Sequence, residues 1–223
     1  RQLGTHNVDV RLNTRPTAQM IQAGGFDAVI AATGAVVNIP KNIEGIYDEN
    51  GQLRSGVMTW ADSCARENEL GHRVTVIGGS EVGIETAMYL AGKGHEVTVL
   101  TRQGKVAHNA SGLHYITQAV VLVGDDGIAR ESAAWKAYPN LHPVTNATTT
   151  KVEGANVLYT DKDGNTQKVE GDSVVLCGGM TPQTEAAMEY AGLTDVFYAI
   201  GDCNGAGNLE VCNREAYARA MLL

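Results

Sequence analysis

The 223-residue sequence contains only four cysteines, and none of them forms a C-x-x-C or C-x4-C pair. A disulfide scaffold is therefore excluded, and a zinc knuckle or a dithiol redox centre is disfavoured. Long apolar runs are also missing: the longest extend over about five or six residues, whereas a membrane-spanning helix needs about 20. The sequence thus predicts neither a transmembrane helix nor a signal peptide.

Basic residues are outnumbered, with 17 Lys and Arg against 25 Asp and Glu, a net charge of −8 and a pI near 5.2. Such a chain has no long-range attraction for nucleic acid or for anionic membranes. We expect small-molecule partners, a cytoplasmic location and reduced thiols that serve as small buried apolar groups, Cys177 especially. The six histidines show no ligand spacing, so no metal site is predicted.

Short apolar runs alternate with helical patterns, which predicts an α/β fold on a parallel sheet. Strands are predicted over residues 9–13, 26–33, 73–77, 96–100, 173–177 and 196–200. Helices are predicted from the Thr17 cap to Gly24, over 60–69, 81–93 and 184–191, and from Asn213 onward. A proline- and glycine-bearing loop is expected over 34–56, an antiparallel hairpin around the turn 161–164, helix or strand over 112–123, and a turn at 125–127.

The clearest unit is strand 73–77, a glycine-rich turn, helix 81–93 and strand 96–100. The turn reads Gly78-Gly79-Ser80-Glu81-Val82-Gly83, close to the G-x-G-x-x-G pattern that places a dinucleotide pyrophosphate at a helix N-terminus. Ser80 departs from the middle glycine, and Glu81 would repel a nearby pyrophosphate. The alternative is a tight strand-to-helix turn that binds nothing.

The second strand of this unit ends at Thr101-Arg102, where proteins that bind NAD carry an Asp or Glu for the ribose hydroxyls. No acid is present there. Because a guanidinium can pair with a 2′-phosphate, the position favours NADP over NAD. The alternative for Arg102 is an ordinary solvated arginine.

Four strings occur in a fixed order: FDAVIAATGA (26–35), RVTVIGGSEVGIETAMYLAGKGHEVTVL (73–100), DSVVLCGGMTP (172–182) and YAIGDC (198–203). Together they resemble the two-dinucleotide flavoproteins of glutathione-reductase type. The resemblance is greatest to the C-terminal half of the old-yellow-enzyme-like reductases, such as 2,4-dienoyl-CoA reductase, trimethylamine dehydrogenase and enoate reductases. It covers most of residues 24–102 and 135–223.

The resemblance implies a Rossmann-like, three-layer parallel sheet with an antiparallel hairpin insertion, plus a truncated second dinucleotide-binding lobe. Residues 37–180 would form the NAD(P)-binding domain. Residues 1–36 and 181–223 would form part of an FAD-binding lobe.

Cofactor-binding roles also follow from the resemblance. Gly78, Gly79, Ser80, Glu81 and Val82 would surround the nicotinamide cofactor's pyrophosphate, with Gly83 packing helix on strand. Glu85 would lie beside the nicotinamide, or simply stabilise its helix as a first-turn acid. The remaining assignments are Gly178 and Gly179 near the nicotinamide cofactor, Thr33 and Gly34 near the FAD adenosine, and Gly201 and Asp202 at the FAD ribityl chain. The alternative for Asp202 is a helix cap.

In such proteins an FAD-binding strand–helix–strand unit precedes this region, as do an FMN-bearing barrel and the cysteines of an iron–sulfur cluster. We therefore expect an N-terminal catalytic domain of the same protein as partner, and no activity from the chain alone. The leading hypothesis is hydride transfer from NADPH (or NADH) to FAD, without a catalytic side chain. A non-catalytic nucleotide-binding module is the alternative, and a dithiol disulfide reductase is disfavoured.

Overall fold

The computed structural model describes residue 6, residues 8–108 and residues 138–223. These residues form two compact units. Unit 1 comprises the described residues up to Val36 together with Met180–Leu223, and unit 2 comprises those between Val37 and Gly179. The expected elements at 112–123 and 125–127 lie outside the described residues.

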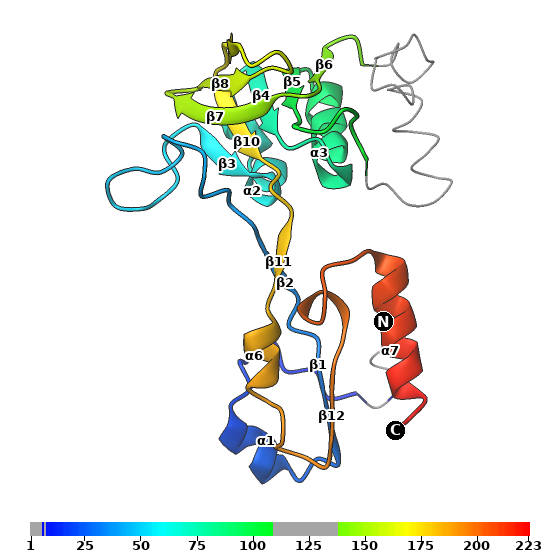
Figure 1. The fold of residues 1–223 in the computed structure, drawn as a ribbon. Coiled ribbons are helices and arrows are strands. Elements are labelled where there is room, and N and C mark those ends of the chain that lie inside the picture. Colours follow the sequence, from blue (N-terminus) through cyan, green and yellow to red (C-terminus); the bar gives the residue numbers. More distant parts are fainter. Residues whose placement is uncertain (1–5, 7, 109–137) are drawn as a thin grey trace. The chain divides into compact units, whose positions relative to one another are not determined.

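Unit 2 is built on a five-stranded sheet in the order β3-β10-β4-β5-β6 (Figure 1). The strands are β3 (Val57–Thr59), β10 (Ser173–Leu176), β4 (Arg73–Ile77), β5 (Glu96–Leu100) and β6 (Leu141–Val144). Every neighbouring pair is parallel. Because parallel strands end at a common edge, the segments that follow β4, β5 and β10 are brought together.

Helix α3 (Glu81–Gly92) connects β4 to β5, as the glycine-rich unit predicts. Its core-facing stripe includes Ile84, Ala87 and Ala91, which are buried in one cluster with β4 and β5. The predicted helix over 60–69 is divided. It forms α2 (Trp60–Ala65) and the 3₁₀ turn η2 (Glu67–Glu69), because Arg66 leaves the helical region with φ −128° and ψ 41°.

A second, antiparallel sheet contains β7 (Thr148–Glu153), β8 (Asn156–Thr160) and β9 (Thr166–Val169). The predicted hairpin accounts for β8 and β9, and β7 is one strand more than predicted. A second buried cluster joins this sheet to the parallel one through Val152, Val157 and Leu176. With α3 packed in the other cluster, unit 2 has three layers, which confirms the predicted α/β, Rossmann-like fold class.

Unit 1 contains two parallel paired strands, β1 (Ala28–Ala31) and β12 (Val196–Ala199). Its helical elements are α1 (Ala18–Gly24), α6 (Thr184–Met188), the 3₁₀ turn η4 (Gly201–Cys203) and α7 (Leu209–Ala220). Thr17 caps α1 as predicted, its hydroxyl accepting from the amide of Met20 at 3.2 Å.

Three predictions for unit 1 are wrong. Residues 9–13 form no strand; they are exposed and turn at Leu12–Asn13. The strand predicted over 26–33 is shorter and is not buried on both faces, since Ile30 is 37% exposed. Helix α7 begins at Leu209 rather than Asn213, because the side chain of Asn208 accepts from the amide of Val211 and caps it.

Two short strands interrupt regions predicted as loop or turn. These are β2 (Ala35–Val37) and β11 (Met180–Pro182), which pair with each other where the chain passes between the two units. In the described part of the chain, no helix combines the length and the apolar character needed to cross a bilayer.

Candidate functional site

The glycine-rich turn follows β4 and allows no side chain at two of its positions. Gly78 has φ +111°, and a Cβ there would lie 2.3 Å from the carbonyl oxygen of Cys177. A Cβ at Gly83 would lie 1.9 Å from the carbonyl oxygen of Gly78. Real Cβ atoms do not approach backbone oxygens so closely. The strand, the turn and the first turn of α3 therefore pack backbone against backbone.

The N-terminus of α3 opens at this turn. Ser80 occupies the N-cap position, but its hydroxyl makes no capping hydrogen bond. Among the described residues no group accepts the amide hydrogens of Val82 and Gly83. Unpaired amides at the positive end of a helix dipole form a site that favours an anion.

Two acids stand close to these amides. Glu81 is the first residue of α3, and Glu85 lies one turn further along the helix. Burial and the negative charge of Glu85 raise the pKa of the Glu81 carboxyl above its ordinary value. Neutralising Glu81 is therefore easier than for a solvated glutamate, which reduces the repulsion that the sequence predicts toward a pyrophosphate.

The loop after β5 lies against the glycine-rich turn. The amide of Ala107 donates to the carbonyl of Gly79 at 2.7 Å, and a Cβ on Gly79 would approach the Cβ of Thr101 to 2.8 Å. Thr101 is only 4% exposed, so its side chain supports the turn, whereas Arg102 is exposed. Of the predicted pair, Arg102 alone presents its side chain to solvent.

The Gly178–Gly179 turn follows β10 at the same edge of the sheet. Asn38 holds it by two hydrogen bonds: its amide donates to the carbonyl of Gly179 at 2.9 Å, and its side-chain Nδ2 to the carbonyl of Gly178 at 3.0 Å. Sequence reasoning missed Asn38, because no sequence pattern indicates that it contacts Gly178, which lies 140 residues further along the chain.

In unit 1 the residues predicted near FAD follow its two parallel strands. Thr33 and Gly34 come after β1, and Gly201 and Asp202 form η4 after β12. Asp202 Oδ1 accepts the amide of Gly207 at 3.0 Å. Its Oδ2 accepts from no described residue.

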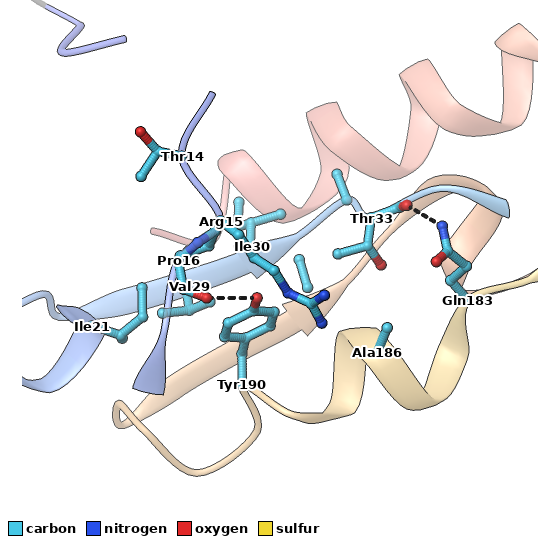
Figure 2. Close-up of a pocket in the computed structure, with 12 residues that line it drawn as sticks. Thr14, Arg15, Pro16, Ile21, Val29, Ile30, Thr33, Gln183, Ala186 and Tyr190 are labelled. Carbon is cyan, nitrogen blue, oxygen red and sulfur yellow. Dashed lines mark hydrogen bonds between the residues drawn. The ribbon is translucent and has the colours of Figure 1, made fainter. Parts of the chain in front are cut away.

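A cavity of about 490 Å³ lies beside β1 in unit 1 (Figure 2). It is lined by Thr14, Arg15, Pro16, Ile21, Val29, Ile30, Ala31, Ala32, Thr33, Gln183, Ala186 and Tyr190. Two hydrogen bonds brace its wall, from Tyr190 Oη to the carbonyl of Pro16 and from Gln183 Nε2 to the carbonyl of Thr33. Thr33 is the predicted site residue that lines it.

The cysteines correct one expectation. Cys177 and Cys203 are buried as expected, but Cys64 is exposed and Cys212 is half-buried. Burial raises the pKa of the Cys177 thiol to about 12. No group of three or more metal-binding side chains gathers within the described ranges.

The thiols should differ in reactivity, because the thiolate is the nucleophile. We expect iodoacetamide at pH 8.5 to label Cys64 in the native chain while Cys177 and Cys203 stay unlabelled. Peptide mass spectrometry before and after denaturation measures this. Labelling of Cys177 at the rate of Cys64 under native conditions would contradict its burial.

Comparisons with known proteins agree with this geometry. Residues 4–216 match the family model described as pyridine nucleotide-disulphide oxidoreductase. A metal reductase of Desulforamulus reducens is 27% identical over 96% of this chain and 34% of its own length. An NADH oxidase of Thermoanaerobacter brockii is 35% identical over 48% of this chain and 16% of its own length.

Among solved structures, a 2-naphthoyl-CoA reductase complex matches with a TM-score of 0.78 and 28% identity, over 97% of this chain and 30% of that one. The chain thus spans about a third of the length of the first relatives it matches. A matched region that takes in nearly all of the chain, together with the nucleotide-type turn between β4 and α3, shows that the chain belongs to the pyridine nucleotide-disulphide oxidoreductase family of nucleotide-binding flavoprotein oxidoreductases.

Proposed function

We propose that this chain carries reducing equivalents from NADPH to FAD, with unit 2 binding the nicotinamide nucleotide and unit 1 contributing to the flavin site. The observation that carries the proposal is the turn from Gly78 to Gly83. It combines two positions where no Cβ fits with a helix N-terminus whose Val82 and Gly83 amides have no described acceptor.

Unit 2 has groups that fit a dinucleotide. The open amides of Val82 and Gly83 and the uncommitted hydroxyl of Ser80 would bind the pyrophosphate oxygens. The exposed Arg102 would bind the 2′-phosphate. The name of one relative specifies NADH, so the preference for NADPH rests on Arg102 and on the lack of an acid beside it.

Unit 1 has groups that fit part of a flavin dinucleotide. Asp202 Oδ2 accepts from no described residue, so it is available to a ribityl hydroxyl. Thr33 and Gly34 would adjoin the adenosine part. When both cofactors are bound, the nicotinamide and the flavin supply the hydride chemistry, and the residues of this chain bind and orient.

The substrate that finally receives the electrons would bind to another part of the full-length protein, outside this chain. We propose that the chain belongs with the old-yellow-enzyme-like reductases, on the basis of the four sequence strings at 26–35, 73–100, 172–182 and 198–203. The likeness to a 2-naphthoyl-CoA reductase over 97% of the chain supports a reductase. The full protein would then pass electrons from FAD to a separate catalytic domain, with FMN and an iron–sulfur cluster as the expected carriers.

The test is anaerobic titration of the flavin-containing holoenzyme with NADPH. The expected result is stoichiometric loss of the flavin band, which lies at about 450 nm. Replacing Asp202 with alanine should weaken flavin retention roughly tenfold, because a hydrogen bond to a charged group contributes about 1.5–3 kcal/mol. NADPH binding without bleaching would favour the non-catalytic nucleotide-binding module instead.

A further inference from the structure

Helix α7 holds the Gly201–Asp202 turn through one carboxylate. The amide of Gly201 donates to Glu215 Oε2 at 2.7 Å, and the side-chain amide of Asn204 donates to Glu215 Oε1 at 3.3 Å. Both oxygens of Glu215 thus contact η4 and the residue after it. A carboxylate that binds a backbone amide at this distance forms a strong, charge-assisted hydrogen bond.

The amide of Gly201 needs this partner because the strand ladder stops one residue earlier. The preceding amide, of Ile200, still donates to the carbonyl of Ala31 at 3.0 Å. Ile200 is extended, with φ −136° and ψ 160°. Because successive amides of an extended strand point to opposite sides, the N–H of Gly201 points away from β1. A half-buried amide without an acceptor would be unfavourable.

A second side chain of α7 contacts the same turn. The thiol of Cys212 lies 3.8 Å from Asp202 Oδ1, within hydrogen-bond distance for sulfur, and a Cβ on Gly201 would lie 3.5 Å from its Sγ. Helix α7 therefore contacts the turn twice: Glu215 holds the amide of Gly201, and Cys212 contacts one carboxylate oxygen of Asp202. These contacts leave Asp202 Oδ2 unoccupied by described residues.

Core packing does not explain these contacts. No residue of α7 is buried, and Leu209 and Tyr217 are 81% and 70% exposed. The other glutamate of the helix, Glu210, pairs loosely with Arg214 at 3.9 Å on the surface. Glu215 is the carboxylate of α7 that reaches the turn.

We propose that Glu215 is a positioning residue for the flavin: by holding the Gly201 amide, it orients the carboxylate of Asp202 toward the ribityl chain. The inference rests on the proposed function of unit 1. It assigns to Glu215 a role through Asp202 and no contact with the flavin itself.

Three single variants of the holoenzyme test this. Glu215→Ala removes the acceptor, Glu215→Gln keeps an oxygen that can accept the Gly201 amide, and Glu210→Ala is the matched control on the same helix. We expect Glu215→Ala to release FAD about tenfold faster and to change the visible circular dichroism of the bound flavin. Glu215→Gln should restore both within about threefold, and Glu210→Ala should match the wild type.

A double variant separates positioning from general destabilisation. If Glu215 acts through Asp202, then Glu215→Ala adds nothing to flavin loss in an Asp202→Ala background. The inference is overturned if the two effects multiply, if Glu215→Ala leaves flavin release and dichroism unchanged, or if Glu210→Ala is equally damaging. If Glu215→Ala does not fold, Glu215→Gln is compared in the wild-type and the Asp202→Ala backgrounds instead. The inference is overturned if Glu215→Gln speeds FAD release and its effect multiplies with that of Asp202→Ala. It is supported if Glu215→Gln releases FAD at nearly the wild-type rate. A wild-type full-length protein that neither contains flavin as purified nor takes it up would refute the proposed function itself.

Discussion

Replacing Gly83 with alanine is expected to reduce both the stability of unit 2 and its affinity for NADPH. The new Cβ would lie 1.9 Å from the carbonyl oxygen of Gly78 and 2.8 Å from its carbonyl carbon. Both atoms belong to the backbone of the turn, so relief requires α3 to move away from β4. Overpacking of this kind costs roughly 1–3 kcal/mol, and valine should be worse than alanine.

The same helix supplies the control. Gly92 is the last residue of α3, and a Cβ there would meet its nearest neighbour, the ring of Tyr138, at an ordinary 3.6 Å. Gly92→Ala should therefore change the free energy of unfolding by no more than about 0.5 kcal/mol. Chemical denaturation and calorimetric titration of NADPH on both variants measure the contrast.

Equal stability of the two alanine variants would contradict the close packing at Gly83. Weaker NADPH binding by Gly83→Ala with unchanged stability would mean that this glycine serves the ligand alone. The expected result is a loss of both, because the turn that packs α3 on β4 is also the turn that presents the Val82 and Gly83 amides.

The glycine-rich unit could be predicted from sequence because its determinants are local. Strands 73–77 and 96–100 have the bounds predicted for them, and α3 ends one residue earlier than predicted. Apolar runs of strand length, a glycine turn and a helical stripe lie within about thirty residues, a usual length for such a unit. Short-range patterns of this kind specify both the elements and their parallel pairing.

Unit 1 was predicted less well, because its elements depend on partners distant in sequence. The alternation over residues 9–13 suits a strand, yet no described segment pairs with it, and the residues are exposed and turn at Leu12–Asn13. The apolar run 26–33 reads as a doubly buried strand. In the structure Ile30 is 37% exposed, and β12 is the one described strand that pairs with β1.

The same distinction holds for the candidate site. Glycines in a turn are visible in sequence, whereas the residues that brace the turns are not. Asn38 and Gln183 each donate to a carbonyl of a turn residue at least 140 positions away. Glu215 lies 14 residues from Gly201 on a helix of low apolarity, with no pattern that would single it out.

The second prediction with a large expected effect concerns the choice of nucleotide. The wild-type chain is expected to bind NADPH about tenfold more tightly than NADH. The Arg102→Ala variant is expected to lose that preference. Arg102 is exposed on the loop after β5, and this loop is fixed to the glycine-rich turn by the bond from Ala107 to Gly79. Within the described ranges no carboxylate pairs with Arg102. A 2′-phosphate would therefore find a guanidinium that no described carboxylate occupies, in a chain whose net charge of −8 otherwise repels it.

The expected size of the NADPH preference depends on how exposed Arg102 is to solvent. A hydrogen bond to a charged group contributes about 1.5–3 kcal/mol, or roughly ten- to a hundredfold in affinity. Salt screens an exposed pair, so the lower end applies at physiological ionic strength and the preference should shrink further as salt rises. Calorimetric titration of both nucleotides at two salt concentrations measures the preference and its screening.

Alanine variants of two lysines serve as controls, because they show whether the NADPH preference depends on Arg102 itself or on positive charge in general. Lys105 is exposed on the same loop as Arg102, whereas Lys93 follows the far end of α3 and lies over the ring of Tyr89. If Arg102 is the selector, Arg102→Ala abolishes the preference while Lys93→Ala and Lys105→Ala retain it. Loss of the preference in Lys105→Ala alone would transfer the role to that lysine. Equal binding of NADPH and NADH by the wild type would refute the assignment, because the exposed Arg102 would then contribute nothing to the distinction between the two nucleotides.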